Sequence, residues 1–287
     1  MQATSSFQGP ASGRLYLVPT PIGNLDDMTF RAIKVLQAVD LIAAEDTRHT
    51  RQLLNHFEID TPTISFHEHN TEQRIPQLLE RLSQGESIAQ CSDAGMPSIS
   101  DPGKELVAAC VQANIPVVPL PGPNAGLTAL IASGLVPQPF YFYGFLERKT
   151  TAQQAELAEI KGRTETTIFY EAPHRLAKTL QNMVEVIGPD RQVVLARELT
   201  KRYEEFIRGT LAEALAWDQA SPVRGEFVIL LAGNSGEDEV TPENQGSPLE
   251  QIKQLVAQGE KVNAAIKQVA KERGLNRQEL YREYHEL

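Results

Sequence analysis

Ser92–Gly103 reads Ser-Asp-Ala-Gly-Met-Pro-Ser-Ile-Ser-Asp-Pro-Gly and points to the fold class. It follows the apolar run Ile88–Cys91, which is typical of a buried strand, and precedes Lys104–Ala113, which has helical spacing. Glycine permits positive φ and proline stiffens the chain, so the mixture predicts a rigid loop with accessible backbone groups. Open α/β sheets bind small molecules at such strand ends. The alternative is an elaborate turn that binds nothing.

Two further loops of the same composition favour the binding interpretation. Pro119–Ala125 reads Pro-Leu-Pro-Gly-Pro-Asn-Ala after the predicted strand Pro116–Leu120. Pro19–Asp27 follows the predicted strand Leu15–Val18 and also contains proline and glycine. Adjacent strand ends that carry such loops would face one crevice.

Strands alternate with helices over the first half of the chain. Thr29 would cap one helix, and Asp46 or Thr47 would cap another that runs to about Phe57. The alternation predicts an α/β protein with a mostly parallel sheet covered on both faces. The other strands and helices expected here are Leu41–Ala44, Thr63–Phe66, Ile75–Leu82 with Pro76 in its first turn, and Asn124–Ser133.

The second half predicts another α/β domain, with mixed strand directions. Its expected strands are Phe140–Phe145, Thr166–Tyr170, Val193–Glu198, Glu204–Arg208 and Glu226–Ala232. Proline-rich residues 134–139 suggest a boundary, which gives an N-terminal domain over 14–134 and a second domain over 135–233. Residues 1–13 are expected to form a disordered leader and residues 234–247 a flexible linker. Residues 248–287 contain an apolar helical stripe broken at Gly274, which leaves a helix-turn-helix-like module and a packed helical hairpin equally open.

Composition bounds the function only loosely. The chain has 287 residues and a formal net charge of −10, which argues mildly against a nucleic-acid partner. Cys91 and Cys110 are expected to be buried thiols in a reducing compartment. P-loop, Gly-x-Gly-x-x-Gly and Gly-x-Ser-x-Gly signatures are absent from the sequence. His67 and His69 share strand spacing but lack a third ligand, so no metal is expected, and neither a signal peptide nor a membrane span is expected.

Six segments stand together in the order of a known family. They are Val18–Leu25, Ala44–Arg48, Ser92–Gly95, Pro121–Pro123, Phe169–Arg175 and Ala196–Lys201. Over roughly Leu15–Gly233 the chain resembles the ribosomal RNA small subunit methyltransferase I family, within the tetrapyrrole-methylase-like superfamily. The resemblance implies two α/β domains of the tetrapyrrole methylase type, with S-adenosyl-L-methionine in the cleft between them. It also implies 2′-O-methylation of a decoding-centre cytidine in the 16S rRNA of the small ribosomal subunit, by a cytoplasmic homodimer.

The resemblance also assigns residues to the methyl donor. By analogy with the superfamily, these are Pro21, Asp93, Gly95, Met96, Asn124, Ala125 and Tyr170. Three positions depart from the family pattern: Met96 replaces Thr, Asn124 replaces Ser and Ala172 replaces Ser. The first two lie in the predicted donor-binding loops, while the hydroxyl missing at Ala172 would serve as a helix cap.

A ribose hydroxyl is a weak acid, so a nearby group must help to remove its proton. Glu45, Asp46 and Lys201 are the catalytic candidates, although capping a helix is an equally good role for Glu45 and Asp46. Other groups at strand ends remain open as the base: His49, His67, Glu171, His174 and Glu198. The RNA-binding candidates are Arg48, His67, Arg175 and Arg197, with a solvated or salt-bridged surface as the alternative role for each arginine.

Two other functions remain open. A methylase of a tetrapyrrole or another small acceptor fits the acidic charge, but such enzymes usually carry a Gly-x-Gly-Pro-Gly-type loop where this chain has Pro19–Asn24. A non-catalytic protein of the same fold that binds RNA or the ribosome would not need the donor loops. Binding of the methyl donor distinguishes the last alternative from the other two.

Overall fold

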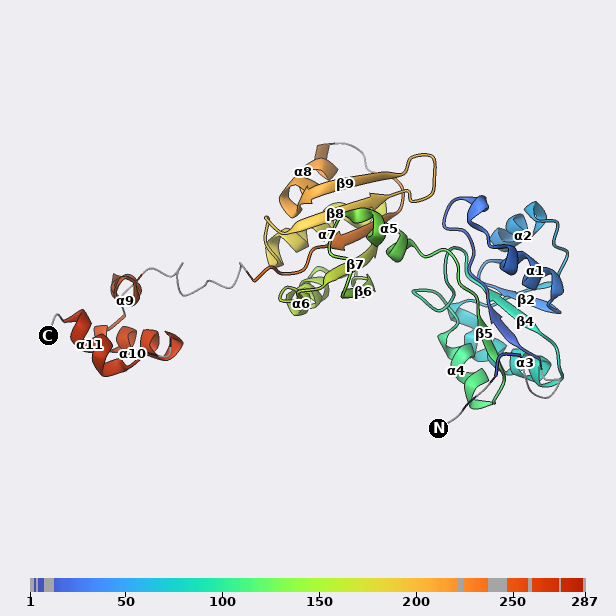
Figure 1. Ribbon diagram of the computed structural model, residues 1–287, viewed down its shortest axis with the longest axis horizontal. Helices are drawn as coiled ribbons and strands as arrows, with labels where there is room; N and C mark the ends of the chain where they lie inside the picture. Colours follow the sequence, from blue (N-terminus) through green and yellow to red (C-terminus); the bar gives the residue numbers. More distant parts are fainter. Residues whose placement is uncertain are drawn as a thin grey trace. The chain divides into compact units, whose positions relative to one another are not determined.

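The computed structural model describes residues 3, 5–7, 13–220, 224–236, 247–257, 260–273 and 275–285 (Figure 1). The chain forms two compact units, residues 1–233 and residues 234–287. Most of the predicted leader, most of the predicted linker and Gly274 lie outside the described residues. None of the helices in the described ranges combines the length and the apolarity needed to cross a membrane.

The first sheet is wholly parallel, as predicted, and has the strand order β3-β2-β4-β1-β5. Alternate residues of β2 enter two different buried clusters, Ile42 and Ala44 on one face and Leu41 and Ala43 on the other. Helices α1 and α2 cover the first face, whereas α3 and α4 cover the second. The elements are β1 (Leu15–Leu17), η1 (Leu25–Asp27), α1 (Phe30–Ala38), β2 (Leu41–Ala44), α2 (Thr47–His56), β3 (Thr63–Ser65), η2 (Glu68–Asn70), α3 (Thr71–Ser83), β4 (Ile88–Cys91), α4 (Lys104–Gln112) and β5 (Val117–Pro119).

Capping side chains set where the helices begin. Thr29 Oγ1 accepts a hydrogen bond from Ala32 N at 3.1 Å, which confirms the predicted cap of α1. Asp46, rather than Thr47, caps α2. The helix predicted over Ile75–Leu82 begins earlier, at Thr71, so Pro76 lies in its second turn rather than its first. Cys91 and Cys110 are buried unpaired thiols, as predicted, and burial raises the pKa of each to about 12.

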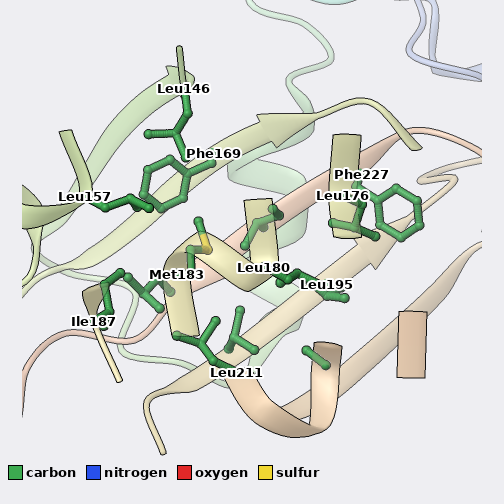
Figure 2. Close-up of a cluster of buried hydrophobic side chains, with 14 of the residues drawn as sticks. Leu146, Leu157, Phe169, Leu176, Leu180, Met183, Ile187, Leu195, Leu211 and Phe227 are labelled. Atoms are coloured by element: carbon green, nitrogen blue, oxygen red, sulfur yellow. The ribbon is translucent and has the colours of Figure 1, made fainter. Parts of the chain in front are cut away.

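The second sheet is mixed, as predicted, with the order β6-β7-β10-β8-β9. Strands β6 and β7 are parallel and the other pairs are antiparallel. Helices α6, α7 and α8 cover one face through a cluster that includes Leu157, Phe169, Leu180 and Leu211 (Figure 2). The elements are β6 (Phe140–Phe145), α6 (Thr150–Ile160), β7 (Thr166–Glu171), α7 (Pro173–Val186), β8 (Gln192–Arg197), β9 (Glu205–Thr210), α8 (Leu211–Ala220) and β10 (Phe227–Leu231).

Helix α5 (Ala125–Ser133) packs on the other face of the second sheet. Its Ala129 and Leu130 lie in one buried cluster with Ile168 of β7 and Val228 of β10. Arg208 of β9 donates hydrogen bonds to the carbonyl oxygens at the end of the same helix. By packing, therefore, α5 belongs with the second sheet, whereas the boundary predicted after Gly134 assigns it to the first domain. The loop that precedes α5, which the sequence predicts to bind the methyl donor, thus joins the two sheets directly.

The C-terminal unit has its own small hydrophobic core. Ile266, Val269 and Ala270 of the predicted stripe are buried, together with Ile252 and Leu280. Its helices are α9 (Pro248–Ala257), α10 (Val262–Arg273) and α11 (Arg277–Tyr284). The sequence predicted the two later helices but not α9.

Candidate active site

Three loops meet where β4, β1 and β5 end side by side. Thr20 and Gly95 exchange two backbone hydrogen bonds of 3.0 Å, which join the loop after β1 to the loop after β4. A Cβ on Gly122 would lie 2.6 Å from the Pro19 side chain, so the loop after β5 approaches its neighbour as closely as glycine allows. The three sequence-predicted loops therefore form one continuous surface.

The β4–α4 loop is tightly constrained. Ser98 and Ser100 both have left-handed backbone angles, with φ of 69° and 62°. Gly103 has φ of 141°, and a Cβ there would collide with the Gln90 and Ser98 side chains. Gln90 is buried and donates a 2.6 Å hydrogen bond to Pro102 O, which anchors the end of the loop. Non-glycine residues in such conformations persist where the surroundings enforce them, often at functional sites.

A cavity of about 400 Å³ opens beside these loops. The N-terminal end of α5 and residues of the second sheet complete its wall, so both halves of the first unit contribute to it. Much of the lining is apolar, and the ionisable carboxyls in it belong to Asp101, Glu171 and Glu226. Among the described lining residues there is no lysine, arginine or histidine. The size is within the range of small-molecule sites, and the charge favours a cationic ligand.

Asp101 is the ionisable residue that sequence reasoning missed. Burial, followed by the charges of Glu45 and Asp93, raises the pKa of this half-buried carboxyl to about 7, although a hydrogen bond with the Ser92 side chain acts to lower it. Its position within the quoted loop was the available signal. In sequence it reads simply as a polar turn residue between Ser100 and Pro102, since burial and neighbouring charges appear only after folding.

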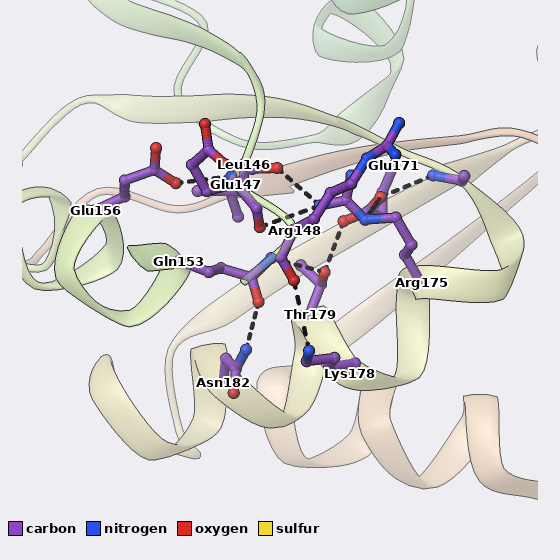
Figure 3. Close-up of polar contacts among 11 residues, drawn as sticks. Leu146, Glu147, Arg148, Gln153, Glu156, Glu171, Arg175, Lys178, Thr179 and Asn182 are labelled. Atoms are coloured by element: carbon purple, nitrogen blue, oxygen red, sulfur yellow. Dashed lines mark hydrogen bonds and ion pairs between the residues drawn. The ribbon is translucent and has the colours of Figure 1, made fainter. Parts of the chain in front are cut away.

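Glu171 is buried within an extended polar network (Figure 3). One carboxylate oxygen accepts a 2.9 Å hydrogen bond from Ala172 N and lies 3.2 Å from Arg175 Nε. The other accepts a 2.6 Å hydrogen bond from Thr179 Oγ1, which in turn accepts one from Gln153 Nε2 at 3.1 Å. A buried carboxylate with this many donors serves as a fixed part of the cavity wall.

Five of the predicted donor-binding residues line the cavity: Gly95, Met96, Asn124, Ala125 and Tyr170. Pro21 and Asp93 are absent from the lining, where their neighbours Ile22 and Ala94 stand instead.

Two of these lining side chains also have internal roles. Asn124 Oδ1 caps α5 by accepting a 2.9 Å hydrogen bond from Leu127 N. The Tyr170 hydroxyl accepts a 3.1 Å hydrogen bond from Gly126 N, and burial raises the pKa of Tyr170.

The predicted catalytic residues lie outside the cavity lining. Glu45 accepts a hydrogen bond from Asp93 N at 3.2 Å, and burial raises its pKa. Asp46 caps α2 and pairs with Arg48, and hydrogen bonds from Arg48 lower its pKa. Lys201 Nζ lies 3.0 Å from Glu198 and 2.9 Å from Glu226. Burial alone would lower the pKa of Lys201, but these two carboxylates raise it.

The predicted RNA-binding residues differ widely in exposure. The Arg48 side chain is 88% exposed, whereas that of Arg175 is only 19% exposed and donates a 2.7 Å hydrogen bond to Leu146 O. Arg197 donates to Arg224 O at 2.7 Å and pairs with Glu205. His67 is half-buried and precedes the turn η2 rather than continuing β3.

The remaining candidates have simpler positions. His49 and His174 are exposed, and Glu198 is held by Lys201. Ala172 is the N-cap residue of α7 and makes no side-chain hydrogen bond there. The serine hydroxyl expected at this position from the family pattern would therefore serve as a helix cap. No cluster of three or more potential metal ligands occurs among the described residues.

The family model described as Tetrapyrrole (Corrin/Porphyrin) Methylases matches residues 14–215. The chain belongs to this family. Ribosomal RNA small subunit methyltransferase I of Streptococcus pyogenes serotype M1 is 52% identical over 100% of both chains. The protein of the same name from Bacillus subtilis (strain 168) is 51% identical over 98% of this chain and 97% of its own. The chain is therefore also a member of the ribosomal RNA small subunit methyltransferase I group, as the sequence resemblance implied.

Solved structures agree on the fold of this methylase. A cobalt precorrin-4 methyltransferase aligns with a TM-score of 0.59 and 17% identity over 76% of this chain and 94% of its own. Uroporphyrin-III C-methyl transferase from Thermus thermophilus, solved with S-adenosylhomocysteine, aligns with a TM-score of 0.55 and 18% identity over 77% of this chain and 97% of its own. The predicted tetrapyrrole methylase architecture is confirmed.

The cavity fits the methyl donor of the family, S-adenosylmethionine. The donor carries a sulfonium cation and an aromatic adenine, and the cavity offers carboxylates without basic side chains beside apolar residues such as Phe145 and Leu199. Rigid loops supply backbone donors and acceptors for the remaining polar groups. The chain is thus an S-adenosylmethionine-dependent methyltransferase.

Proposed function

We propose that this methyltransferase methylates the 2′-hydroxyl of a decoding-centre cytidine in the 16S rRNA of the small ribosomal subunit. The single observation that carries the proposal is the 52% identity, over the full length of both chains, with a relative named ribosomal RNA small subunit methyltransferase I. The cavity supports it, because about 400 Å³ beside a set of rigid loops suits a donor of this size. A cytoplasmic location follows from the substrate.

In the proposed complex, Gly95, Met96, Asn124, Ala125 and Tyr170 hold the donor from the cavity wall. Pro21 and Asp93 act indirectly in this proposal: they fix the loops that carry the lining residues Ile22 and Ala94. The bound donor supplies an electrophilic methyl group on a sulfonium. The protein's own contribution is alignment, since holding the reacting atoms in line is worth several kcal/mol of the barrier.

Arg48 is the strongest phosphate contact in the proposed RNA interface, because its guanidinium projects into solvent from the start of α2 and its partner there is the Asp46 carboxylate at the surface. His67 lies half-buried near Glu45 and would contact RNA only at the edge of the site. Arg175 and Arg197 would have to exchange internal hydrogen bonds for phosphate, so we expect them to contribute less.

We also infer that the protein works as a homodimer. Large apolar side chains are exposed to solvent when the chain is considered alone: Phe30 is 86% exposed and Ile131 is 82% exposed. Multi-angle light scattering should give twice the chain mass of 31.7 kDa. A mass that stays at one chain at micromolar concentration would contradict the dimer.

The test is transfer of labelled methyl from S-adenosylmethionine to purified small ribosomal subunits. Ala125→Trp places an indole in the cavity and should abolish both donor binding and labelling. Ala158→Trp makes the same change on the exposed surface of α6 and should leave both intact. Donor binding without any label in RNA would refute the proposal and favour a small-molecule acceptor. Failure of the wild-type chain to bind the donor would favour a non-catalytic RNA-binding protein.

A further inference from the structure

The loop after β6 and the first turns of α7 carry three exposed cations beside the cavity. Arg148 and Lys149 lie in the loop, and Lys178 lies on α7. Lys178 Nζ donates a hydrogen bond of 3.5 Å to Arg148 O, so the two segments are in contact. Figure 3 shows Arg148 and Lys178 on these two segments. These three residues are called the basic rim below.

The basic rim lies close to the cavity wall. Phe145 and Pro173, which precede the two segments of the rim, both line the cavity. Arg148 follows Phe145 by three residues, so the two Cα atoms lie within about 11 Å of each other. Five residues of helix separate Pro173 from Lys178, a rise of about 7.5 Å. The backbone of a polymer whose acceptor group meets the cavity is therefore within reach of the rim.

Internal hydrogen bonds hold the loop of the rim in place. Arg175 Nη2 donates to Leu146 O at 2.7 Å and to Glu147 O at 3.3 Å. The Glu156 carboxylate accepts a 2.9 Å hydrogen bond from Glu147 N. Arg175, which the sequence predicts to bind RNA, thus fixes the backbone immediately before the rim. A loop that is ordered in advance loses less entropy when a ligand binds.

The charges of the rim are not neutralised by neighbouring carboxylates. Among the described residues, no ion pair joins any of the three rim cations to a carboxylate, and Glu147 is the acidic residue within the loop. Other basic side chains near the strand ends are paired: Arg48 with Asp46, Arg197 with Glu205 and Lys201 with Glu198. The chain has a net charge of −10, so a group of unpaired cations beside the cavity stands out from its surroundings.

Charge is distributed differently inside and outside the cavity. The lining holds carboxylates and no basic side chain among the described residues, which suits the sulfonium cation of the donor. The cations lie just outside, where the acceptor must approach, and guanidinium and ammonium groups bind phosphate well. We propose that the basic rim binds the phosphate backbone of the RNA beside the nucleotide to be methylated, an inference that rests on the function proposed above. The rim adds a second contact surface to the one predicted at Arg48.

The deciding variant combines Arg148→Gln, Lys149→Gln and Lys178→Gln, and the probe is binding of purified small ribosomal subunits at several salt concentrations. We expect the affinity to fall roughly tenfold at low salt, and the plot of log affinity against log salt concentration to become shallower by about 2 to 3, since each lost phosphate contact removes about 1 from the slope. The Kd for S-adenosylmethionine and the urea midpoint should not change, because the three residues are exposed and lie outside the cavity lining.

A matched variant removes the same charge elsewhere. Arg31 and Lys34 are exposed on α1, and Lys161 is exposed immediately after α6. Changing these three residues to glutamine also lowers the net charge by three, but it leaves the rim intact. We expect this control to bind small subunits within about twofold of the wild type, because exposed charges far from a contact are screened by salt.

The inference is overturned if the rim variant binds small subunits within about twofold of the wild type. It is also overturned if the affinity falls while the salt slope is unchanged, because release of counterions from phosphates is what produces the slope. That result would indicate an acidic protein surface of the subunit as the partner. A wild type that binds the donor and the subunits but labels no RNA refutes the proposed function instead, since the rim is tested by binding rather than by methyl transfer.

Discussion

The Glu171–Arg175 pair offers the sharpest test of how the cavity wall is built. Arg175→Met removes the guanidinium but keeps much of the apolar stem. It leaves Glu171, which is 1% exposed, with hydrogen bonds from the Ala172 N–H and the Thr179 hydroxyl. Removing one partner of a buried ion pair typically costs about 3–5 kcal/mol, because the other charge stays buried. Since Arg175 is 19% exposed, we expect a loss near the lower end, about 3 kcal/mol.

A double-mutant cycle separates this effect from lost packing. In a Glu171→Gln background Arg175→Met leaves no buried carboxylate without its partner, so it should cost only about 1 kcal/mol, and the coupling should be about 2 kcal/mol. The assay is urea denaturation followed by fluorescence of Trp217, the single tryptophan, which packs against the core that α7 contributes to.

Arg48→Met is the matched control, because the same substitution there breaks an ion pair whose arginine is 88% exposed. Its urea midpoint should not move, although RNA methylation should weaken. A loss below 1 kcal/mol for Arg175→Met, or an equal loss in both backgrounds, would refute a structural role for the pair and restore Arg175 as an RNA contact.

Three further predictions concern the loops and the C-terminal unit. Asp101→Asn should stabilise the protein by about 1 kcal/mol at pH 8, and the gain should shrink toward pH 4. The raised pKa of Asp101 means that the folded wild type binds the proton more tightly than the unfolded chain does. The stability of the wild type therefore falls as the pH rises to about 7. Equal urea midpoints at pH 8 would contradict this. Gly103→Ala should cost about 2 kcal/mol or more and weaken donor binding, because φ is 141° and its Cβ meets Gln90, whereas Gly162→Ala meets open space and should be neutral in the same denaturation assay. Deleting residues 248–287 should leave the thermal melting of residues 1–233 unchanged, because the C-terminal helices have their own core. If the C-terminal unit contacts the ribosome, the deletion should lower methylation of small subunits about tenfold. Unchanged methylation would exclude such a contact.

Local sequence patterns were enough to predict much of the fold. Thr29 and Asp46 cap their helices because short polar side chains satisfy exposed N–H groups wherever the chain turns into a helix. Alternation of strands and helices was enough to predict the parallel first sheet. The position of α5 was not readable in the same way. Its apolar residues fit either sheet, and only tertiary packing places Ala129 and Leu130 against the second.

The loops of the site could be predicted from their glycine and proline content, but the roles of its charged side chains could be predicted less well. Glycine and proline marked the loops that line the cavity, and five of the assigned residues lie in its wall. Lys201 and Arg175 looked available in sequence, but they pair with Glu198 and Glu171, which stand three and four residues before them. Asp101 was overlooked for a different reason, since its raised pKa comes from burial and from the charges of Glu45, on another loop, and Asp93, at the other end of its own loop, which the fold brings close to it.

The most direct test of the central claim is to map the product. Small ribosomal subunits incubated with the enzyme and labelled S-adenosylmethionine would be digested, and the position and chemistry of the label determined. We predict label at a single cytidine of 16S rRNA, with the adjacent phosphodiester resistant to alkali because the 2′-oxygen is methylated. Label on a base, or a bound donor with no label in the RNA, would contradict the account.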